Sequence, residues 1–297
     1  MRWSFAQLAC LAFCLLLVSL ISPETAHAQE PKSDNPNQPG TPNSPPVTAQ
    51  DDADSGDMLT LFPHSDTAPF WISGQANIIF QWHPSFQAKY SGPNSFHSFG
   101  ENATSKVYTL FLGYQLTHYT EVMVDVESAG GRGLSAALGM AGFVNLDVVR
   151  NPELGPVPYL ARAMVRQIIP LSSERVSAER GPFGLATSLP VRRLEFRVGK
   201  MGLVDFFDTN SWGTDSRLQF LNWTVDNNGA YDYAANTRGY TDAAILEYDD
   251  HWFTVRFGEA LMPKVANGIF LDADLARARS ENLEIDATGN LLSLIHI

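Results

Sequence analysis

Alternation of apolar and polar residues with a period of two constrains the fold of this chain more than any other feature. In residues 70–82, FWISGQANIIFQW, one face is mostly apolar or small, and Trp71 and Ile79 are exceptions on the other. The polar face carries Ser73, Gln75, Asn77 and Gln81. Successive side chains of a strand point to opposite sides, whereas a helix repeats every 3.6 residues. The segment therefore predicts a β-strand with two different faces.

The same alternation recurs along the chain in about seven segments of about ten residues each. Short turns at 118–119 and 249–251 alternate with long loops, and the loop 128–158 holds one predicted short helix near 133–143. The turn spacing predicts antiparallel hairpins. The other six predicted segments are 107–117, 120–128, 158–169, 192–200, 240–249 and 252–261.

Within these segments the polar face carries charged residues. Val122, Val124 and Val126 alternate with Glu121, Asp125 and Glu127, and Leu194, Phe196 and Val198 alternate with Arg193, Glu195 and Arg197. In 158–169 the pattern places Tyr159, Ala161, Ala163 and Val165 on the face opposite Arg162 and Arg166.

Two architectures explain such strands. A soluble β-sandwich turns its apolar face to a dry core, whereas an outer-membrane barrel turns it to lipid and its polar face to a lumen. Charges in mid-strand, and small residues such as Gly74 and Ala163 on the apolar face, favour the barrel. So do aromatic residues near the predicted strand ends: Phe70, Trp82, Tyr108, Tyr114, Tyr159 and Trp252.

The N-terminal region has the composition of targeting and linker segments. Residues 1–28 combine Arg2, an apolar run and the site Ala26-His27-Ala28, so they are predicted to be a secretory signal peptide. Both cysteines, Cys10 and Cys14, lie within it, so disulfides are not expected in the mature chain. Residues 29–57 are rich in Pro, Asn, Asp and Ser and are predicted to be a disordered tether.

The charge balance excludes one class of partner. The chain has 20 Lys and Arg against 32 Asp and Glu, for a net charge of −12. A basic patch that could neutralise phosphates is missing, so nucleic acid is not an expected partner.

Several stretches carry a family resemblance. They are ISGQANIIFQ, FQAKYSGPNSF, TLFLGYQL, DVESAGGRGLSAALGMAGFVN, PYLARAMVRQIIPL, KMGLVDFFDTNSWGTDSRLQFLNW and NGAYDYAANTRGYT, in this order. The matches run from about residue 70 to 270 and cover most of the mature chain. This set resembles the carbohydrate-selective porin family of Gram-negative outer membranes. The resemblance implies an all-β, antiparallel transmembrane β-barrel of sixteen strands in the cell outer membrane, monomeric and surrounded by lipid, through which small sugars diffuse passively. It implies neither enzyme activity nor a cofactor.

The length departs from that family. The barrel domain, residues 58–291, supplies about half of the sixteen strands. The last six residues, LSLIHI at 292–297, match the translation of a common transposon-end sequencing adapter, so they are predicted to be a non-native tail and the chain to be the N-terminal part of a longer barrel.

The predicted solute path follows the polar face. A channel for neutral sugars needs hydrogen-bonding groups, and mixed charges avoid a ring of one sign that would collect ions. The candidate substrate-binding residues are Asp125, Glu127, Arg162, Arg166, Arg193, Glu195, Arg197 and Arg256. The same residues can instead brace the wall as ladders between strands. Tyr231, Tyr233 and Tyr240 are expected at the membrane interface, and Trp212 and Trp223 either there or folded inward as sugar platforms.

Catalytic and metal sites are not expected. The carboxylate pairs Asp125/Glu127 and Asp205/Asp208 have the composition of a glycoside hydrolase site, but no closed cleft accompanies them. The seven histidines lack ligand spacing. The alternative function is a periplasmic β-sandwich that binds or hydrolyses glycans.

Overall fold

The structure is a computed structural model, and its described residues all belong to one compact unit, residues 60–297. It describes residues 62–148, 154–210, 213–215, 219–226 and 231–287. The predicted signal peptide (1–28), the predicted tether (29–57) and the predicted tail (292–297) all lie outside the described residues, so these assignments stay predictions.

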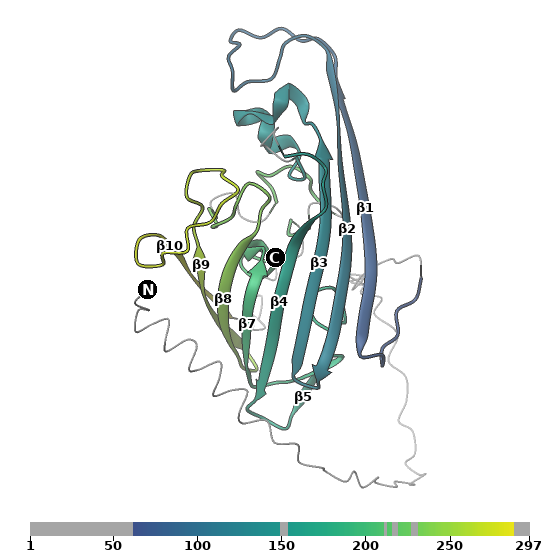
Figure 1. Cartoon of the computed structure of the whole chain (residues 1–297), viewed down its shortest axis with the longest axis vertical. Coiled ribbons are helices and arrows are strands. Elements are labelled where there is room, and N and C mark those ends of the chain that lie inside the picture. The colour runs from purple at the N-terminus through teal and green to yellow at the C-terminus, as the bar shows by residue number, and fades with distance from the viewer. Residues whose placement is uncertain (1–61, 149–153, 211–212, 216–218, 227–230, 288–297) are drawn as a thin grey trace, which may run out of the picture. The chain divides into compact units, whose positions relative to one another are not determined.

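Ten strands and three short 3-10 helices make up the described fold (Figure 1). In chain order they are β1 (Phe70–His83), β2 (Glu101–Thr117), β3 (Thr120–Gly131), η1 (Leu134–Ala137), η2 (Gly139–Val144), β4 (Tyr159–Pro170), β5 (Arg175–Ser177), β6 (Ser188–Pro190), β7 (Arg193–Met201), η3 (Leu203–Asp205), β8 (Thr241–Asp249), β9 (Phe253–Leu261) and β10 (Arg279–Ala287). The short helix predicted near 133–143 is thus two 3-10 turns, η1 and η2.

Eight strands form one antiparallel sheet in the order β1-β2-β3-β4-β7-β8-β9-β10, and β5 pairs with β6 in a separate hairpin. The predicted all-β, antiparallel fold is confirmed. Among the described residues the sheet is open, with β1 and β10 at its edges, as a partial barrel would be. A second large sheet stacked on the first is absent from the described part of the chain, so the sandwich architecture is not the one observed.

One strand of the sheet was not predicted. β10 has few apolar residues: Leu283 and Ile285 alternate with Asn282, Glu284 and Asp286. This alternation is too weak to predict a strand from the sequence. In the residues that the structure describes, no helix has the length and apolar character needed to cross a membrane.

Burial is inverted relative to a soluble sheet. On β3, Glu121 and Asp125 are fully buried, whereas Val122, Val124 and Val126 are partly exposed. We call the side of the sheet that carries Glu121 and Asp125 the inner face and the opposite side the outer face. The polar residues of the alternating pattern therefore lie inside, and the apolar ones outside.

A bulge in β4 corrects the predicted orientation of Tyr159 and Ala161. Asp125 pairs with Arg162 and Val126 pairs with Leu160, so Ala161 is an extra residue in the strand. An extra residue shifts the alternation by one. Tyr159 and fully buried Ala161 therefore share the inner face with Arg162, and Tyr159 is not one of the outward strand-end aromatics.

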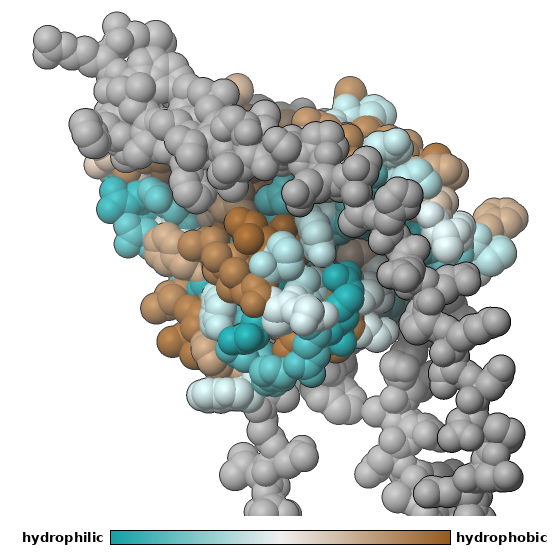
Figure 2. Space-filling view, turned by 90° about the horizontal axis from the view of Figure 1, so that it is seen from below, coloured by the Kyte–Doolittle hydropathy of each residue, from teal (hydrophilic) through white to brown (hydrophobic). Residues whose placement is uncertain are grey.

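The apolar core lies on the inner face, under two connections that fold back over the sheet. Met123, Met164 and Ile245 contribute from the strands. Leu185 comes from the connection between β4 and β7, and Leu203, Phe206 and Phe207 come from the connection between β7 and β8. Seen from the end where the short turns lie, brown apolar groups reach the surface beside teal polar ones (Figure 2).

Candidate functional site

A chain of charges with alternating sign crosses the inner face from β3 to β10, and we call it the charge ladder. Its members are Glu121, Arg166, Glu195, Arg197, Glu247, Arg256 and Glu284. Glu121 accepts from Arg166 at 3.1 Å, and Arg166 donates from Nε to Glu195 at 2.7 Å. Arg256 at the far end contacts both Glu247 and Glu284. Every step joins residues on the same or neighbouring strands, so strand register alone positions the ladder.

Glu195 is the most heavily contacted member of the ladder. Its carboxylate accepts from Arg166, from Arg193 Nε at 2.6 Å and from Arg197 at 2.5 Å, and its side chain is fully buried. Three guanidinium groups around one carboxylate provide the hydrogen bonds that a buried charge needs.

A second, shorter group lies nearer the long loops. Arg162 donates two hydrogen bonds to Asp205, at 2.7 and 2.8 Å, and one to Asp125 at 3.2 Å. Glu127 beside it accepts from Thr109, Tyr159 and Tyr240. Asp205 belongs to η3, so this fork ties the connection after β7 to the wall.

The structure brings all eight predicted site residues to the inner face. Six of them are buried, and the side chains of Arg193 and Arg256 are each 14% exposed. Such burial favours bracing of the wall over direct contact with a solute, because a covered side chain has little surface to offer. Contact of these residues with sugars stays a prediction.

Sequence reasoning left out several members of this network. Glu121 and Glu247 occupy the same alternating positions in predicted strands as the predicted residues, so strand parity alone is a signal that identifies them. Glu284 lies on β10, the strand that the sequence did not predict. Asp205, by contrast, lies outside the strands, and its pairing with Arg162 carries no local signal.

The tyrosines of 231–240 do not lie where the sequence placed them. Tyr240 is buried, and its hydroxyl donates to Glu127 at 3.0 Å. Tyr231 donates to Asn282 at 3.0 Å, and both it and Tyr233 pack against the inner core. The predicted membrane-interface position is wrong, because this segment folds over the inner face instead. Trp223 packs edge-on against Phe143, and Trp212 lies outside the described residues.

Three carboxylates of the inner face lie close enough to hold a cation. Ligand oxygens of Glu195, Glu247 and Asp249 lie within 4.8 Å of one another. Each also contacts an arginine: Asp249 with Arg193 at 3.1 Å, and Glu247 with Arg256. The arginines already balance these charges, so the arrangement fits an ion-pair network better than a metal centre.

The outer face carries a continuous apolar band. Phe80 is 67% exposed and Trp82 63% on β1, and Leu283 and Ile285 on β10 are exposed to a similar degree. Between them the band includes Leu110, Tyr114, Val165, Leu246 and Phe257, all exposed. An apolar surface of this extent on one face is typical of a surface that is covered in the working protein.

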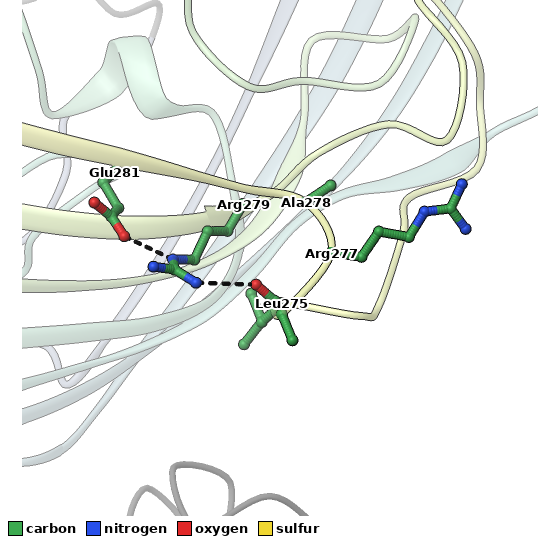
Figure 3. Close-up of a pocket in the computed structure, with 6 residues that line it drawn as sticks. Leu275, Arg277, Ala278, Arg279 and Glu281 are labelled. Atoms are coloured by element: carbon green, nitrogen blue, oxygen red, sulfur yellow. Dashed lines mark hydrogen bonds and ion pairs between the residues drawn. The ribbon is translucent and has the colours of Figure 1, made fainter.

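A shallow open hollow lies beside the start of β10, lined by Leu275 and the residues that follow it (Figure 3). Arg279 donates from Nε to Glu281 at 2.6 Å and from Nη1 to the Leu275 carbonyl at 3.2 Å, while Arg277 points away. These exposed, mutually satisfied side chains offer little to a ligand.

Comparisons with known proteins give one distant likeness. No family model matches the chain, and no curated protein matches it. Among solved structures, the chain is similar to OprB of Pseudomonas putida at high pH, with 15% identity and a TM-score of 0.45. The match covers 73% of this chain and 47% of that one, so this chain spans less than half of that protein's length.

Proposed function

We propose that the chain forms the wall of a passive channel in the outer membrane, with the outer apolar band against lipid and the inner face toward the passage. The observation that carries this proposal is the inversion of burial across the sheet. Buried charged side chains lie on the inner face, while a band of exposed apolar side chains crosses the outer face. The face that a soluble antiparallel sheet exposes to water is normally polar, so a continuous apolar face is not expected in a soluble protein.

The slope of the apolar band supports the same proposal. The band spans Phe70 to Trp82 on β1 and Leu283 to Ala287 on β10. The row of paired residues that starts at the middle of the band on β1 can be traced across the sheet to β10, over seven strand-to-strand pairings. On β10 the middle of the band lies about ten residues along the strand from this row. With a rise of ~3.3 Å per residue and a strand spacing of ~4.8 Å, the band crosses the hydrogen-bonded rows at roughly 45°. Strands of membrane barrels tilt by about this angle.

The proposed solutes are small neutral sugars. The inner charges alternate in sign, so they do not form a ring that would select anions or cations. Towards β1 the inner face carries uncharged Ser73, Gln75 and Asn77, which offer hydrogen bonds to hydroxyl groups. Sugar selectivity also rests on the sequence resemblance.

The function is tested by electrical recording. The full-length protein, with the strands that complete the barrel, should give stepwise conductance in a planar bilayer, and added glucose or maltose should reduce each step more than glycerol at matched viscosity. The protein should also fractionate with the outer membrane and change its gel mobility on heating. A water-soluble product that gives no conductance would instead support the periplasmic glycan-binding alternative.

The role of the predicted sugar-contacting residues has its own test. Arg193→Ala and Arg197→Ala should each weaken the block of the current by sugar if their guanidinium groups contact the solute. Unchanged block in both variants would assign these arginines to bracing the wall.

A further inference from the structure

The connection between β4 and β7 differs from the other two connections at the same end of the sheet. β2–β3 and β8–β9 are joined by the short turns 118–119 and 250–252, whereas β4–β7 are joined by residues 171–192. We call residues 171–192 the lower insert. It contains the β5–β6 hairpin, whose tip closes with Gly181 and Gly184 exchanging two backbone hydrogen bonds, at 2.8 and 3.3 Å.

The tip of the lower insert is seated on the inner face. Leu185 is buried, and its backbone N–H donates to Glu121 of the charge ladder at 3.1 Å. Below it the wall carries Gly113, where a Cβ would lie 2.9 Å from Leu185 Cδ1. A larger residue at 113 would occupy the place of the leucine, so the wall has a specific seat for this tip.

The connection from the opposite end also folds onto the inner face. Residues 202–240 join β7 to β8 at the end of the long loops, and Leu203, Phe206 and Phe207 of this segment are buried. A glycine again lies beneath, because a Cβ on Gly258 would come within 2.8 Å of the Phe207 ring. Asp205 of the same segment is held by Arg162.

The two connections meet over the wall. Phe183 of the lower insert lies edge-on to Phe206, with ring centroids 6.2 Å apart. Arg162 lies over the Phe183 ring at 4.8 Å and Arg197 over the Phe206 ring at 5.0 Å. Cation–π contacts of this kind fix both rings against charged residues of the sheet.

We propose that the lower insert sets the width of the passage, with its tip 181–185 forming a size-selecting constriction at the level where Phe183 meets Phe206. This inference rests on the proposed channel function. The tip projects from the inner face, so any solute that follows this face must pass it. Phe183 is only partly buried against the core, so part of its ring stays uncovered by the described residues.

The register of the hairpin allows the tip to be removed cleanly. Ser177 pairs with Ser188, and the next pair is hydrogen-bonded, with Ala178 N–H donating to the Thr187 carbonyl at 2.9 Å, so an Asn-Gly turn can replace residues 179–186 and close the two strands. We expect this shortened variant to give larger conductance steps than the unaltered chain, and to admit longer oligosaccharides in a liposome-swelling assay. Val176→Ser, at an exposed position at the base of the insert, is the control and should leave both the conductance and the size limit unchanged.

A second variant carries the test if the shortened chain fails to insert. Phe183→Ala keeps the insert and removes only the ring, so it should raise the size limit in the same direction but by less. The proposal is overturned if the shortened variant leaves both the conductance and the size limit unchanged. Where the shortened variant does not insert, the same result in Phe183→Ala overturns it. All of these variants are made in the full-length protein. If that protein gives no conductance when unaltered, the proposed function itself is wrong, which separates the two failures.

Discussion

At the scale of single residues, the inner face depends on charges that are satisfied by one another. Arg166, Arg193 and Arg197 converge on Glu195 from two neighbouring strands. Removing one partner of a buried ion pair leaves the other charge uncompensated. The loss of a single member of such a network therefore lowers the free energy of unfolding strongly.

Replacement of Glu195 tests this dependence. Glu195→Gln removes the only charge shared by the three guanidinium groups, and we expect the free energy of unfolding in lipid vesicles, measured in urea, to fall by about 3–5 kcal/mol. Glu281→Gln is the matched control, because that carboxylate is 54% exposed and its change should stay within about 1 kcal/mol. Equal losses in the two variants would contradict the buried-network account.

A second residue-scale cluster lies beyond the apolar band. At the ends of β1 and β2, Glu101 accepts from His83 and His97 at 3.2 Å and from Ser135 at 2.5 Å. The hydrogen bond of His83 to the Pro84 carbonyl, together with Glu101, raises the pKa of His83 above its ordinary value. Burial alone would raise the pKa of Glu101, but its hydrogen bonds to Ser135 and the histidines lower it.

These shifts predict a pH window for the loop 84–100. The raised pKa of His83 gives stabilisation that is lost as the pH rises through that pKa, and the lowered pKa of Glu101 gives stabilisation that is lost as the pH falls through its own. Hydrogen–deuterium exchange, corrected for its intrinsic pH dependence, should therefore show the loop most protected between the two pKa values. Glu101→Gln should flatten this profile. A profile that is unchanged in the variant would rule the cluster out as its cause.

At the scale of elements, β2 carries an apolar stretch on its outer face and a polar stretch beyond it. On β2 the outer residues from Tyr108 to Leu116 are apolar or aromatic, whereas Lys106, Thr104 and Asn102 are polar. The change from one to the other marks the predicted edge of the hydrocarbon layer on this strand.

Arginine substitutions on the outer face of β2 test that edge. Leu110→Arg places a charge within the band, and we expect it to lower the unfolding free energy in vesicles by about 2–4 kcal/mol. Asn102→Arg, also exposed and on the same face, should cost about 0–1 kcal/mol. A similar loss of unfolding free energy in the two variants would contradict a hydrocarbon edge between these two positions of β2.

Period-two alternation predicted seven of the eight strands of the main sheet because it is a local property of the chain. It could not predict the bulge at Ala161, since PYLARAM alternates equally well with or without an extra residue. Nor could it predict the inward fold of the connections. Leu185 packs against Gly113, 72 positions earlier in the chain, and Tyr240 donates a hydrogen bond to Glu127. Contacts between such distant residues leave no pattern in the local sequence.

At the scale of the whole molecule, the eight-stranded sheet separates an exposed apolar outer side from an inner side that carries both the charge ladder and the buried apolar core. The charge ladder runs along the inner side from β3 to β10, and the apolar band slopes across the outer side at an angle suited to tilted strands. The same sequence pattern produces both, because each strand contributes alternate residues to the two sides.

The central claim, that the outer face contacts hydrocarbon, is tested most directly by a cysteine scan of β3 from 122 to 126. Outside residues 10 and 14 the chain has no cysteine, so each introduced thiol carries a single fluorescent label once the predicted signal peptide is removed. In vesicles of brominated lipid, the account predicts strong quenching of labels at Val122, Val124 and Val126 and weak quenching at Met123 and Asp125. Quenching without this alternation, or strongest at Met123 and Asp125, would contradict it.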